Sequence, residues 1–374
     1  MEKYHVCLVS DQPIPNLIPA LLEQPSGVIL LTSREMKERA AWLRLVLERK
    51  GIRVGECEID AYDFTSVASS CEKLIRQAGS ARTLELNVTC GTKIAALAGF
   101  HVFSNAGKRI FYQNTANSQL LELGPALSNK PIHGNHISVF DYLTAYGFSL
   151  MTEGGPTVGF EKRQPYLKAL GRVLLHNNTL LGRLNATVER YGRKTSASFP
   201  LKELGAGGDE LINLFVQCGV VSRSDTEVVT MPAEQNVFFC KGGWLEEYVF
   251  QAVFDLELDG LKPLINTNVV GKRHHLIENE FDVLFTYTDR LFIISCKTGR
   301  LDREMQGLPT KGKEALYELD SLSADAGGLF GRAMLVSARP VRPVDRNRAK
   351  EMDIALVEGT EVLEFEQKLR DWLR

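Results

Sequence analysis

The chain has 374 residues, of which 44% are hydrophobic, and its formal net charge is −2. This length fits two or three domains, and the near-neutral charge excludes a basic whole-surface nucleic-acid binder, so any such contact must use local patches. Seven scattered cysteines without a C-x-x-C pair argue against disulfides and structural zinc and fit a reducing cytoplasm. Neither an apolar run of 18 residues nor a signal-peptide pattern is present, so we expect a cytoplasmic protein with no membrane partner.

The N-terminal part, residues 1–150, alternates short apolar runs with helical patterns. The runs cover about 5–10, 28–33, 53–59 and 83–89, which predicts an α/β domain with a parallel, doubly wound sheet. Ligands of such sheets bind at the carboxyl ends of the strands. The candidate ligand-binding residues at those ends are Ser10, Asp11, Gln12, Thr32, Ser33, Thr89, Cys90, Gly91, Thr92 and Lys93.

The segment Thr89–Lys93 leads straight into a helical pattern at 94–98. Free amides and the dipole at a helix N-terminus favour anions such as phosphate. The spacing of a Walker loop is absent, and no G-x-G-x-x-G follows the first strand, which argues against an ordinary NAD domain. A helix cap with a solvated lysine is the simpler alternative.

Residues 151–235 predict a helical connector, with helices near 166–175 and 209–216 and a short wing near 226–230 that would make it winged-helix-like. The connector could transmit a signal, contact substrate or do neither, and the sequence does not decide between these roles.

The C-terminal part, residues 236–374, opens with a helical pattern at 242–253 whose apolar stripe is flanked by Glu246 and Glu247. Two apolar strands then flank the turn 287–290, so a hairpin should bring Asp282 opposite the stretch from Ser295 to Lys297. An acid and a lysine at the end of a buried hairpin persist most easily where they bind something charged, such as a metal beside a phosphate. A strand-end salt bridge is the alternative.

This order of elements, with a further helix at about 311–323, resembles the PD-(D/E)xK nuclease superfamily. The resemblance implies a restriction-endonuclease-like domain that hydrolyses phosphodiester bonds with Mn²⁺ or Mg²⁺. In that reading Asp282 and the backbone carbonyl of Cys296 bind the metal. Lys297 holds the scissile phosphate or the attacking water, and Glu246 or Glu247 orients that water.

Ser295 departs from the nuclease pattern, which has an acid two residues before the lysine. A hydroxyl is a weak metal ligand, and Glu280, two residues before Asp282 on the same strand face, is the candidate replacement. A Ser295-dependent preference for manganese over magnesium is a further hypothesis. The alternative is a degenerate domain that binds nucleic acid without cutting it.

The segment Asn87–Lys93 resembles the N-x-T-G-G-T-K signature of CARF domains, with Cys90 in place of the first glycine, and residues 9–17 resemble the first loop of that family. CARF domains are Rossmann-like sensors that dimerise and bind cyclic oligoadenylates of type III CRISPR systems. The fusion resembles the cyclic-tetra-adenylate-activated CRISPR ancillary nucleases. It implies a homodimer with one composite ligand site across its two-fold axis.

We therefore expect a metal-dependent endonuclease of antiviral defence that acts on DNA, RNA or both and is activated by a cyclic oligoadenylate. The rivals are a ligand-responsive regulator with an inactive nuclease domain and a constitutive enzyme whose first domain binds an unrelated nucleotide. Two basic stretches, 272–275 and 332–350, either bind a phosphate backbone or are solvated faces. The sequence leaves open the kind of nucleic acid, the ring size of the activator and whether the first domain degrades it.

Overall fold

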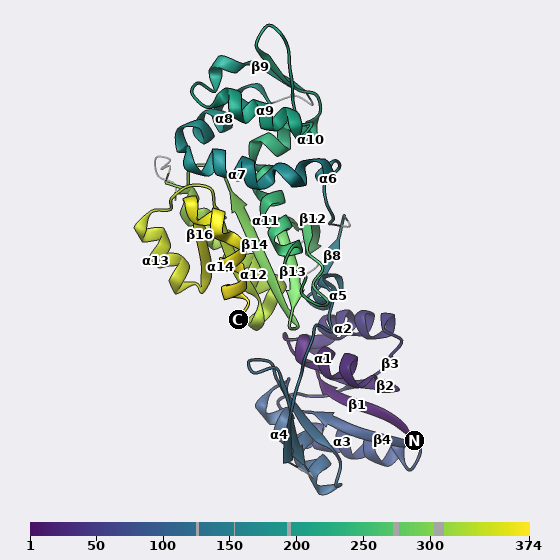
Figure 1. The fold of residues 1–374 in the computed structure, drawn as a ribbon. Coiled ribbons are helices and arrows are strands. Elements are labelled where there is room, and N and C mark those ends of the chain that lie inside the picture. The colour runs from purple at the N-terminus through teal and green to yellow at the C-terminus, as the bar shows by residue number, and fades with distance from the viewer. Residues whose placement is uncertain (125–126, 153, 193–195, 272–276, 303–309) are drawn as a thin grey trace.

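The computed structural model describes residues 1–124, 127–152, 154–192, 196–271, 277–302 and 310–374. Figure 1 shows three parts in a row, with the N-terminal part at one end and the connector at the other. The C-terminal part lies between them, so it contacts both, although the connector precedes it in the sequence. No helix in the described ranges is long and apolar enough to cross a membrane.

The N-terminal part is built on a seven-stranded sheet of order β3-β2-β1-β4-β5-β6-β7. Its first five strands pair in parallel, as predicted, and the hairpin of β6 and β7 adds an antiparallel edge that the sequence analysis did not place. The strands are β1 (Glu2–Leu8), β2 (Gly27–Thr32), β3 (Arg53–Glu58), β4 (Arg82–Asn87), β5 (Ile110–Asn114), β6 (Gln119–Gly124) and β7 (Leu127–Pro131).

Helices cover both faces of this sheet, because each parallel connection crosses over it. One face packs α1 (Ile14–Glu23) and α2 (Lys37–Arg49), which follows the turn η1 (Arg34–Met36). The other face packs α3 (Phe64–Ala78) and α4 (Lys93–Asn105). The chain then leaves through α5 (Val139–Ala145) and the short strand β8 (Phe148–Leu150), which joins the C-terminal sheet.

The connector holds helices and the three-stranded antiparallel sheet β10-β11-β9. The hairpin of β10 and β11 lies where the wing was expected, and α7 and α9 match the expected helices. The elements are α6 (Phe160–Arg163), η2 (Gln164–Tyr166), α7 (Leu167–His176), α8 (Asn178–Tyr191), β9 (Ala197–Pro200), η3 (Leu201–Glu203), α9 (Gly208–Gln217), β10 (Ser222–Arg223), β11 (Val228–Met231) and α10 (Glu234–Phe238).

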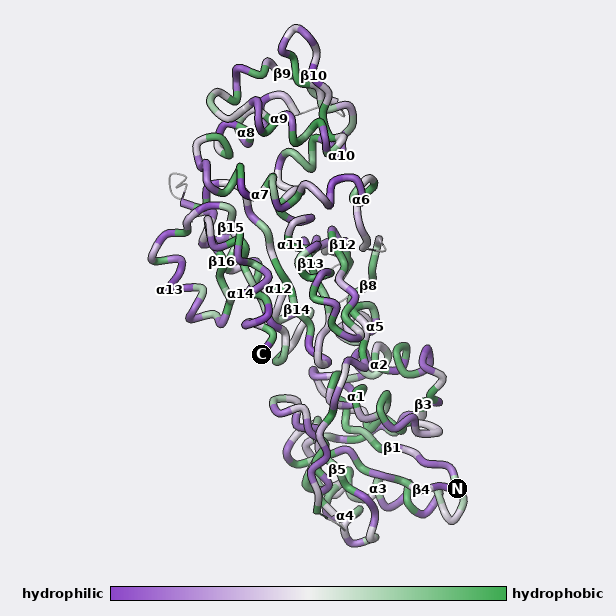
Figure 2. Tube along the Cα trace, viewed as in Figure 1, coloured by the Kyte–Doolittle hydropathy of each residue, from purple (hydrophilic) through white to green (hydrophobic). Residues whose placement is uncertain are grey.

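The C-terminal part is built on the six-stranded sheet β16-β15-β14-β13-β12-β8. Its central strand β14 contains the buried apolar run Leu291–Ile294, and it pairs antiparallel with β13 and in parallel with β15. Figure 2 shows the hydropathy along the chain. The strands are β12 (Leu264–Gly271), β13 (Ile277–Tyr287), β14 (Arg290–Lys297), β15 (Arg332–Ser337) and β16 (Ile354–Glu358).

Helices pack on both faces of this sheet too. One face carries the π-helical turn η4 (Phe239–Gly243), α11 (Trp244–Phe254), η6 (Gly359–Glu364) and α14 (Phe365–Trp372). The other face carries α12 (Lys311–Gly327), the turn η5 (Gly328–Phe330) and α13 (Pro343–Glu351). Helix α11 is buried nearly all round, so the expectation of a single buried stripe was wrong: the connector covers the side that was expected to face solvent.

Candidate active site

The β13–β14 hairpin forms as the sequence predicts, with the two-residue loop Thr288–Asp289. Both loop residues have positive φ, 48° and 59°. This is the backbone conformation of the tight turns whose twist matches the twist of paired strands. The register pairs Val283 with Ile294, which brings Asp282 level with Ser295.

Asp282 is held by two donors from β14. The backbone N–H of Cys296 donates to its Oδ2 at 2.6 Å, and the Ser295 hydroxyl donates to the same oxygen at 3.2 Å. Both bonds orient the carboxylate and leave Oδ1 as the oxygen best placed for a cation. Ser295, where the nuclease pattern has an acid, thus positions Asp282.

Glu280, Asp282 and Lys297 line one small pocket between the hairpin and α12. Burial and the neighbouring Asp282 raise the pKa of the Glu280 carboxyl, while Lys297 acts in the opposite direction. The structure therefore brings these three predicted residues together.

Glu246, in the first turn of α11, shares this electrostatic environment. Burial, followed by the charges of Asp282 and Glu280, raises the pKa of its carboxyl well above the ordinary value, and Lys297 lowers it only partly. Its Oε2 is buried and has no hydrogen-bond partner among the described residues. A buried carboxylate oxygen in this state is costly unless something positive binds it.

Glu247 was predicted as an alternative to Glu246, but the structure does not bring it to this site. It is 2% exposed and forms a two-pronged ion pair with Arg163 of the connector, at 2.6 and 2.8 Å, with a further bond from Thr157. Successive helical residues point in different directions, so only one of the two glutamates can face the hairpin. Arg163 lies 84 residues earlier in the chain, so no local sequence pattern predicts this contact.

A divalent cation fits the residues that are present. The carboxylates of Glu246, Glu280 and Asp282 act on one ammonium, Lys297, which leaves a formal excess of two negative charges. Carboxylate oxygens are preferred ligands of Mg²⁺ and Mn²⁺. Cys296, whose carbonyl was the other predicted ligand, adjoins the site and lines the cavity described next.

A cavity of about 960 Å³ opens beside Glu246 and Lys297. One wall belongs to α8 of the connector, and the others belong to η4, the loop after β14 and the turn after β15, all in the C-terminal part. Its basic lining residues outnumber the acidic ones, Glu189 and Glu246; they are Arg183, Lys241, Lys297, Arg300, Lys311 and Arg339. Such a cavity suits a polyanion.

The basic stretch 332–350 is not the continuous free patch that the sequence suggested. Arg342 and Arg348 pair with the buried Asp345, and Arg346 pairs with Glu358. Pairs at spacings of three and twelve residues reduce the net positive charge of α13. Arg339 is the member that lines the cavity. The other basic stretch, 272–275, lies outside the described residues.

The predicted ligand loops of the N-terminal part lie together at the carboxyl edge of its sheet. Cys90 Sγ donates to the carbonyl of Gln12, and the Thr92 hydroxyl caps α4 while donating to the carbonyl of Ala61. Gly91 has φ +82°, and a Cβ there would lie 2.9 Å from Leu8 Cβ, which explains the glycine.

These loop residues are not equally available to a ligand. Asp11, Gly91 and Lys93 are exposed, and Ser10, Gln12, Thr89 and Thr92 are partly exposed, whereas Thr32, Ser33 and Cys90 are buried. Ser33 nevertheless lines a second cavity, of about 610 Å³, with residues that follow β2 and β3. The loops thus remain candidate ligand contacts, with Thr32 the least accessible of them.

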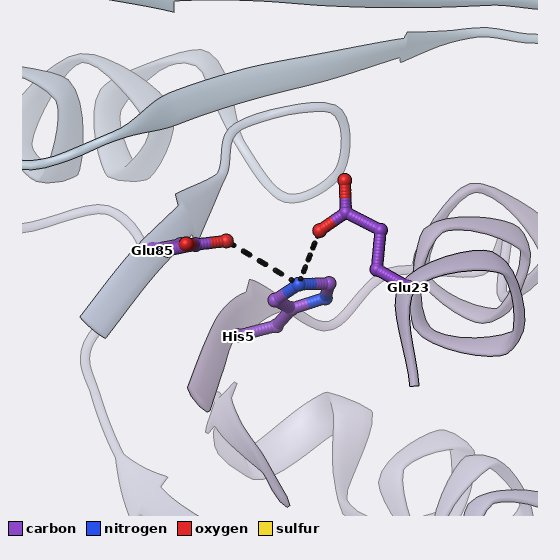
Figure 3. Close-up of side chains that lie close together, drawn as sticks. All are labelled: His5, Glu23 and Glu85. Carbon is purple, nitrogen blue, oxygen red and sulfur yellow. Dashed lines mark hydrogen bonds and ion pairs between the residues drawn. The ribbon is translucent and has the colours of Figure 1, made fainter. Parts of the chain in front are cut away.

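A cluster of charges on the N-terminal sheet escaped the sequence analysis. Nε2 of His5 lies 3.1 Å from Glu23 and 3.6 Å from Glu85 (Figure 3). The three could hold a cation, but Arg109 already fills that role, with contacts of 2.7, 2.5 and 2.6 Å to Glu23, Glu85 and Glu122. The members come from α1, β1, β4 and β6, so only the folded sheet unites them.

Comparisons with known families match both ends of the chain. Residues 4–142 match the model of the Card1 CARF domain, and residues 233–374 match the model of the Card1-like endonuclease domain. The predicted fold class, a Rossmann-like CARF domain followed by an endonuclease domain, is confirmed. None of the curated proteins compared with the chain matches it.

Solved structures share the fold over the whole chain. Can2 from Sulfobacillus thermosulfidooxidans, in complex with cyclic tetra-adenylate, has a TM-score of 0.79 and 24% identity, covering 100% of this chain and 99% of its own. Protein VC1899 from Vibrio cholerae has a TM-score of 0.87 and 23% identity, with coverage of 99% and 98%. A type III CRISPR defence DNA nuclease activated by cyclic oligoadenylate has a TM-score of 0.55 and 20% identity, covering 92% of this chain and 47% of its own.

Proposed function

Because its two ends belong to the CARF and endonuclease domain families of Card1-like proteins, we propose that this protein is a nuclease of type III CRISPR defence, activated by a cyclic oligoadenylate. Cyclic tetra-adenylate is the activator we favour, because the Can2 structure of the same fold contains it. The proposed division is 1–150 for the sensor, 151–235 for the connector and 236–374 for the nuclease.

The observation that carries the proposed chemistry is the grouping of Glu246, Glu280 and Asp282 around Lys297. A divalent metal bound there lowers the pKa of water and offsets negative charge on a phosphodiester as it is attacked. Asp282, oriented by β14, and the two glutamates would hold that metal. The Lys297 ammonium would bind a non-bridging phosphate oxygen and stabilise the charge that develops on it.

A homodimer is part of the proposal. Beside the ligand loops, four large apolar side chains are exposed, namely Tyr62 at 74%, Phe64 at 44%, Ile94 at 40% and Leu97 at 64%. Ile94 and Leu97 lie one turn apart on α4, directly after Lys93. An exposed apolar strip next to a ligand edge favours a self-complementary contact that would place two copies of the ligand loops around one symmetric ring.

The test is a cleavage assay on single-stranded RNA, single-stranded DNA and supercoiled plasmid, with and without cyclic tetra-adenylate and Mn²⁺. We expect cutting that requires both additions and is lost in Lys297→Ala. Cutting without the activator would separate the two halves of the proposal. Binding of the activator without any cutting would favour a nucleic-acid-binding regulator with an inactive nuclease domain.

Ser295 is the observation that favours this second function, since it supplies no acid where the nuclease pattern has one. Ser295→Glu adds a carboxylate opposite Asp282, and we expect it to raise magnesium-supported cutting relative to manganese-supported cutting. An unchanged ratio of the magnesium-supported and manganese-supported activities would show that Ser295 does not determine the metal preference.

A further inference from the structure

Helix α8 of the connector packs against the end of the strand that carries Lys297. The Asn185 amide donates to the carbonyl of Thr298 at 2.9 Å, and the Thr298 hydroxyl donates to the carbonyl of Lys241 at 3.1 Å. The residue directly after Lys297 is therefore fixed from α8 of the connector and from η4 of the C-terminal part. The connector and the nuclease together build the cavity beside the proposed metal site.

Arg339 enters this cavity from the turn after β15. Lys297 pairs with Ser337 in the neighbouring strand, and the N–H of Ala338 donates to the Lys297 carbonyl at 2.9 Å. Arg339 follows directly, so its backbone lies next to the strand end that holds Lys297. Its guanidinium reaches across to α8, where Nη2 donates to the carbonyl of Asn178 at 3.2 Å.

No carboxylate lies within ion-pair distance of the Arg339 guanidinium in the described ranges, although the charge of Asp302 partly offsets it, and its buried Nε has no acceptor there. Burial and the nearby Arg300 lower its pKa, so the folded protein holds this cation at a cost. Arg300 itself pairs with Asp302, at 2.9 Å. A partly buried guanidinium of this kind is relieved by an anion that accepts from its fork of donors.

Among the residues that the structure describes, three buried polar atoms on the lining of this same cavity have no hydrogen-bond partner: Glu246 Oε2, Asn185 Oδ1 and Arg339 Nε. The carboxylate oxygen needs a cation and the guanidinium needs an anion, while the amide oxygen can accept from a ligand hydroxyl or amine. A metal together with a polyphosphodiester would satisfy the carboxylate oxygen and the guanidinium at once.

We propose that Arg339 binds a backbone phosphate of the substrate next to the one that is cut, and that α8 of the connector forms the facing wall of the substrate groove. This inference rests on the proposed nuclease function and names the second phosphate contact of the same site. Lys297 and Arg339 would then hold neighbouring phosphates, and the connector would be part of the substrate-binding surface.

Gly182 makes the proposal testable without removing the arginine. A Cβ at Gly182 would lie 2.9 Å from Arg339 Nη2, so Gly182→Ala must displace the guanidinium. Alanine is also the better residue in the interior of a helix, which favours an unchanged or higher melting temperature. Loss of binding in this variant could therefore not be assigned to unfolding.

The experiment measures the affinity of the full-length protein for a fluorescein-labelled oligodeoxythymidylate at several NaCl concentrations, in EDTA so that nothing is cut, with and without cyclic tetra-adenylate. For Arg339→Gln and Gly182→Ala we expect affinity about tenfold lower and a log–log salt slope shallower by about 0.7, the loss of one phosphate contact. Arg339→Lys should keep the slope and lose part of the affinity.

Arg190→Gln is the matched control, because Arg190 lies on the same helix with a side chain 66% exposed, paired with Glu203 away from the cavity. It should bind like the wild type. Wild-type affinity and slope in both Arg339→Gln and Gly182→Ala would overturn the proposal, as would a wild-type protein that does not bind the probe. If the wild type binds but never cuts with activator and Mn²⁺, the nuclease function fails while the phosphate contact stands.

Discussion

The side chain of Gln12, in the loop after β1, accepts a hydrogen bond from the Tyr146 hydroxyl at 2.9 Å. The same oxygen, Oε1, accepts from the backbone N–H of Leu329 at 3.2 Å. Leu329 lies in η5, directly after α12, and α12 lines the pocket that contains Asp282. A residue of the sensor edge thus contacts an element that reaches the candidate active site.

The contact is tightly built. Gly328 has φ +59°, and a Cβ there would lie 2.1 Å from the Tyr146 oxygen and 2.6 Å from the Gln12 oxygen. The ring of Tyr146 stacks on Tyr142, whose hydroxyl donates to the carbonyl of Gly327 at 2.8 Å. A ligand that moved the loop of Gln12 would therefore act on the end of α12 directly.

Tyr146→Phe should weaken activation while leaving the ring stack in place. One hydrogen bond is worth about 0.5–1.5 kcal/mol, so we expect the ratio of cleavage rates with and without cyclic tetra-adenylate to fall several-fold. Rates at saturating activator and the affinity for the activator measure this. An unchanged ratio would show that the Gln12 contact does not carry the signal.

A second contact joins the β13–β14 hairpin to the segment after the sensor sheet. Asp289, at the hairpin tip, accepts from the N–H of His136 at 2.5 Å and from the N–H of Ile137 at 3.2 Å. Arg290 donates to the carbonyls of Thr115 and Ala116. The opposite end of the same hairpin carries Asp282 and Lys297, so the sensor holds one end of the element whose other end forms the site.

Glu247→Gln tests the role that the structure gives this residue. It leaves the Arg163 charge buried without its partner, which costs about 3–5 kcal/mol, so the melting temperature should fall clearly. Cleavage by the folded enzyme at low temperature should stay close to wild type. The double change Arg163→Met with Glu247→Met should recover stability, since apolar pairs often replace buried ion pairs without loss. A variant that melts like the wild type but no longer cuts would return Glu247 to the catalytic residues.

The elements of the fold follow from local pattern where that pattern is strong. Three features could be predicted: the parallel strands of the sensor, the hairpin that carries Asp282 and the helix after Thr310. Their signals are hydrophobic alternation, turn residues and helix caps, which depend only on residues near in sequence. The hairpin of β6 and β7 was not predicted, because β7 is exposed and mostly polar and has no apolar pattern.

The site was predictable as far as its residues are near in sequence. Asp282, Ser295 and Lys297 are joined by one hairpin, so spacing could place them. Whether Glu246 or Glu247 faced the hairpin depended on Arg163, a connector residue far away in the chain. Arg339 could be seen only as one arginine in a basic stretch, because pairing of its neighbours with Asp345 and Glu358 requires the folded α13 and β16.

Glu246→Gln should stabilise the protein and reduce its activity. A carboxyl whose pKa is raised in the folded state destabilises the fold as the pH rises from the pKa of the unfolded state through the pKa of the folded state. At neutral pH the folded protein keeps this carboxyl protonated at a cost, so a neutral amide should raise the free energy of unfolding by an amount on the order of 1 kcal/mol and raise the melting temperature.

The same substitution should reduce the effect of metal. Mn²⁺ bound at the candidate site should stabilise the wild type by about 2.7 kcal/mol at a concentration one hundred times its Kd, and a thermal melt with and without Mn²⁺ measures this. The rise in melting temperature on adding Mn²⁺ should be smaller in Glu246→Gln than in the wild type, and the rise in Glu246→Asp should lie between these two. An equal rise in both proteins would remove Glu246 from the metal site.

Arg109→Met should destabilise the sensor domain, and the loss should depend on pH. Burial would raise the pKa of Glu23 and of Glu85, but hydrogen bonds from His5 and Arg109 outweigh it and hold both pKa values below the ordinary range. Groups of this kind contribute stability that is present above the unfolded pKa, about 4.3 for Glu, and is lost as pH falls through the folded value.

Without Arg109 the buried carboxylates repel one another. We therefore expect the free energy of unfolding at pH 7.5 to fall by about 3 kcal/mol, which is at the lower end of the values for broken buried ion pairs. Their pKa values then rise, so the variant takes up protons at a higher pH than wild type and the gap in melting temperature should narrow toward roughly pH 5. Arg82→Met, which removes an exposed partner of Glu2 at 3.8 Å, should cost under about 1 kcal/mol at either pH. A gap that stays constant between the two pH values would mean that Arg109 stabilises the sheet by packing, through its contact with the Phe111 ring, and not by neutralising the acids.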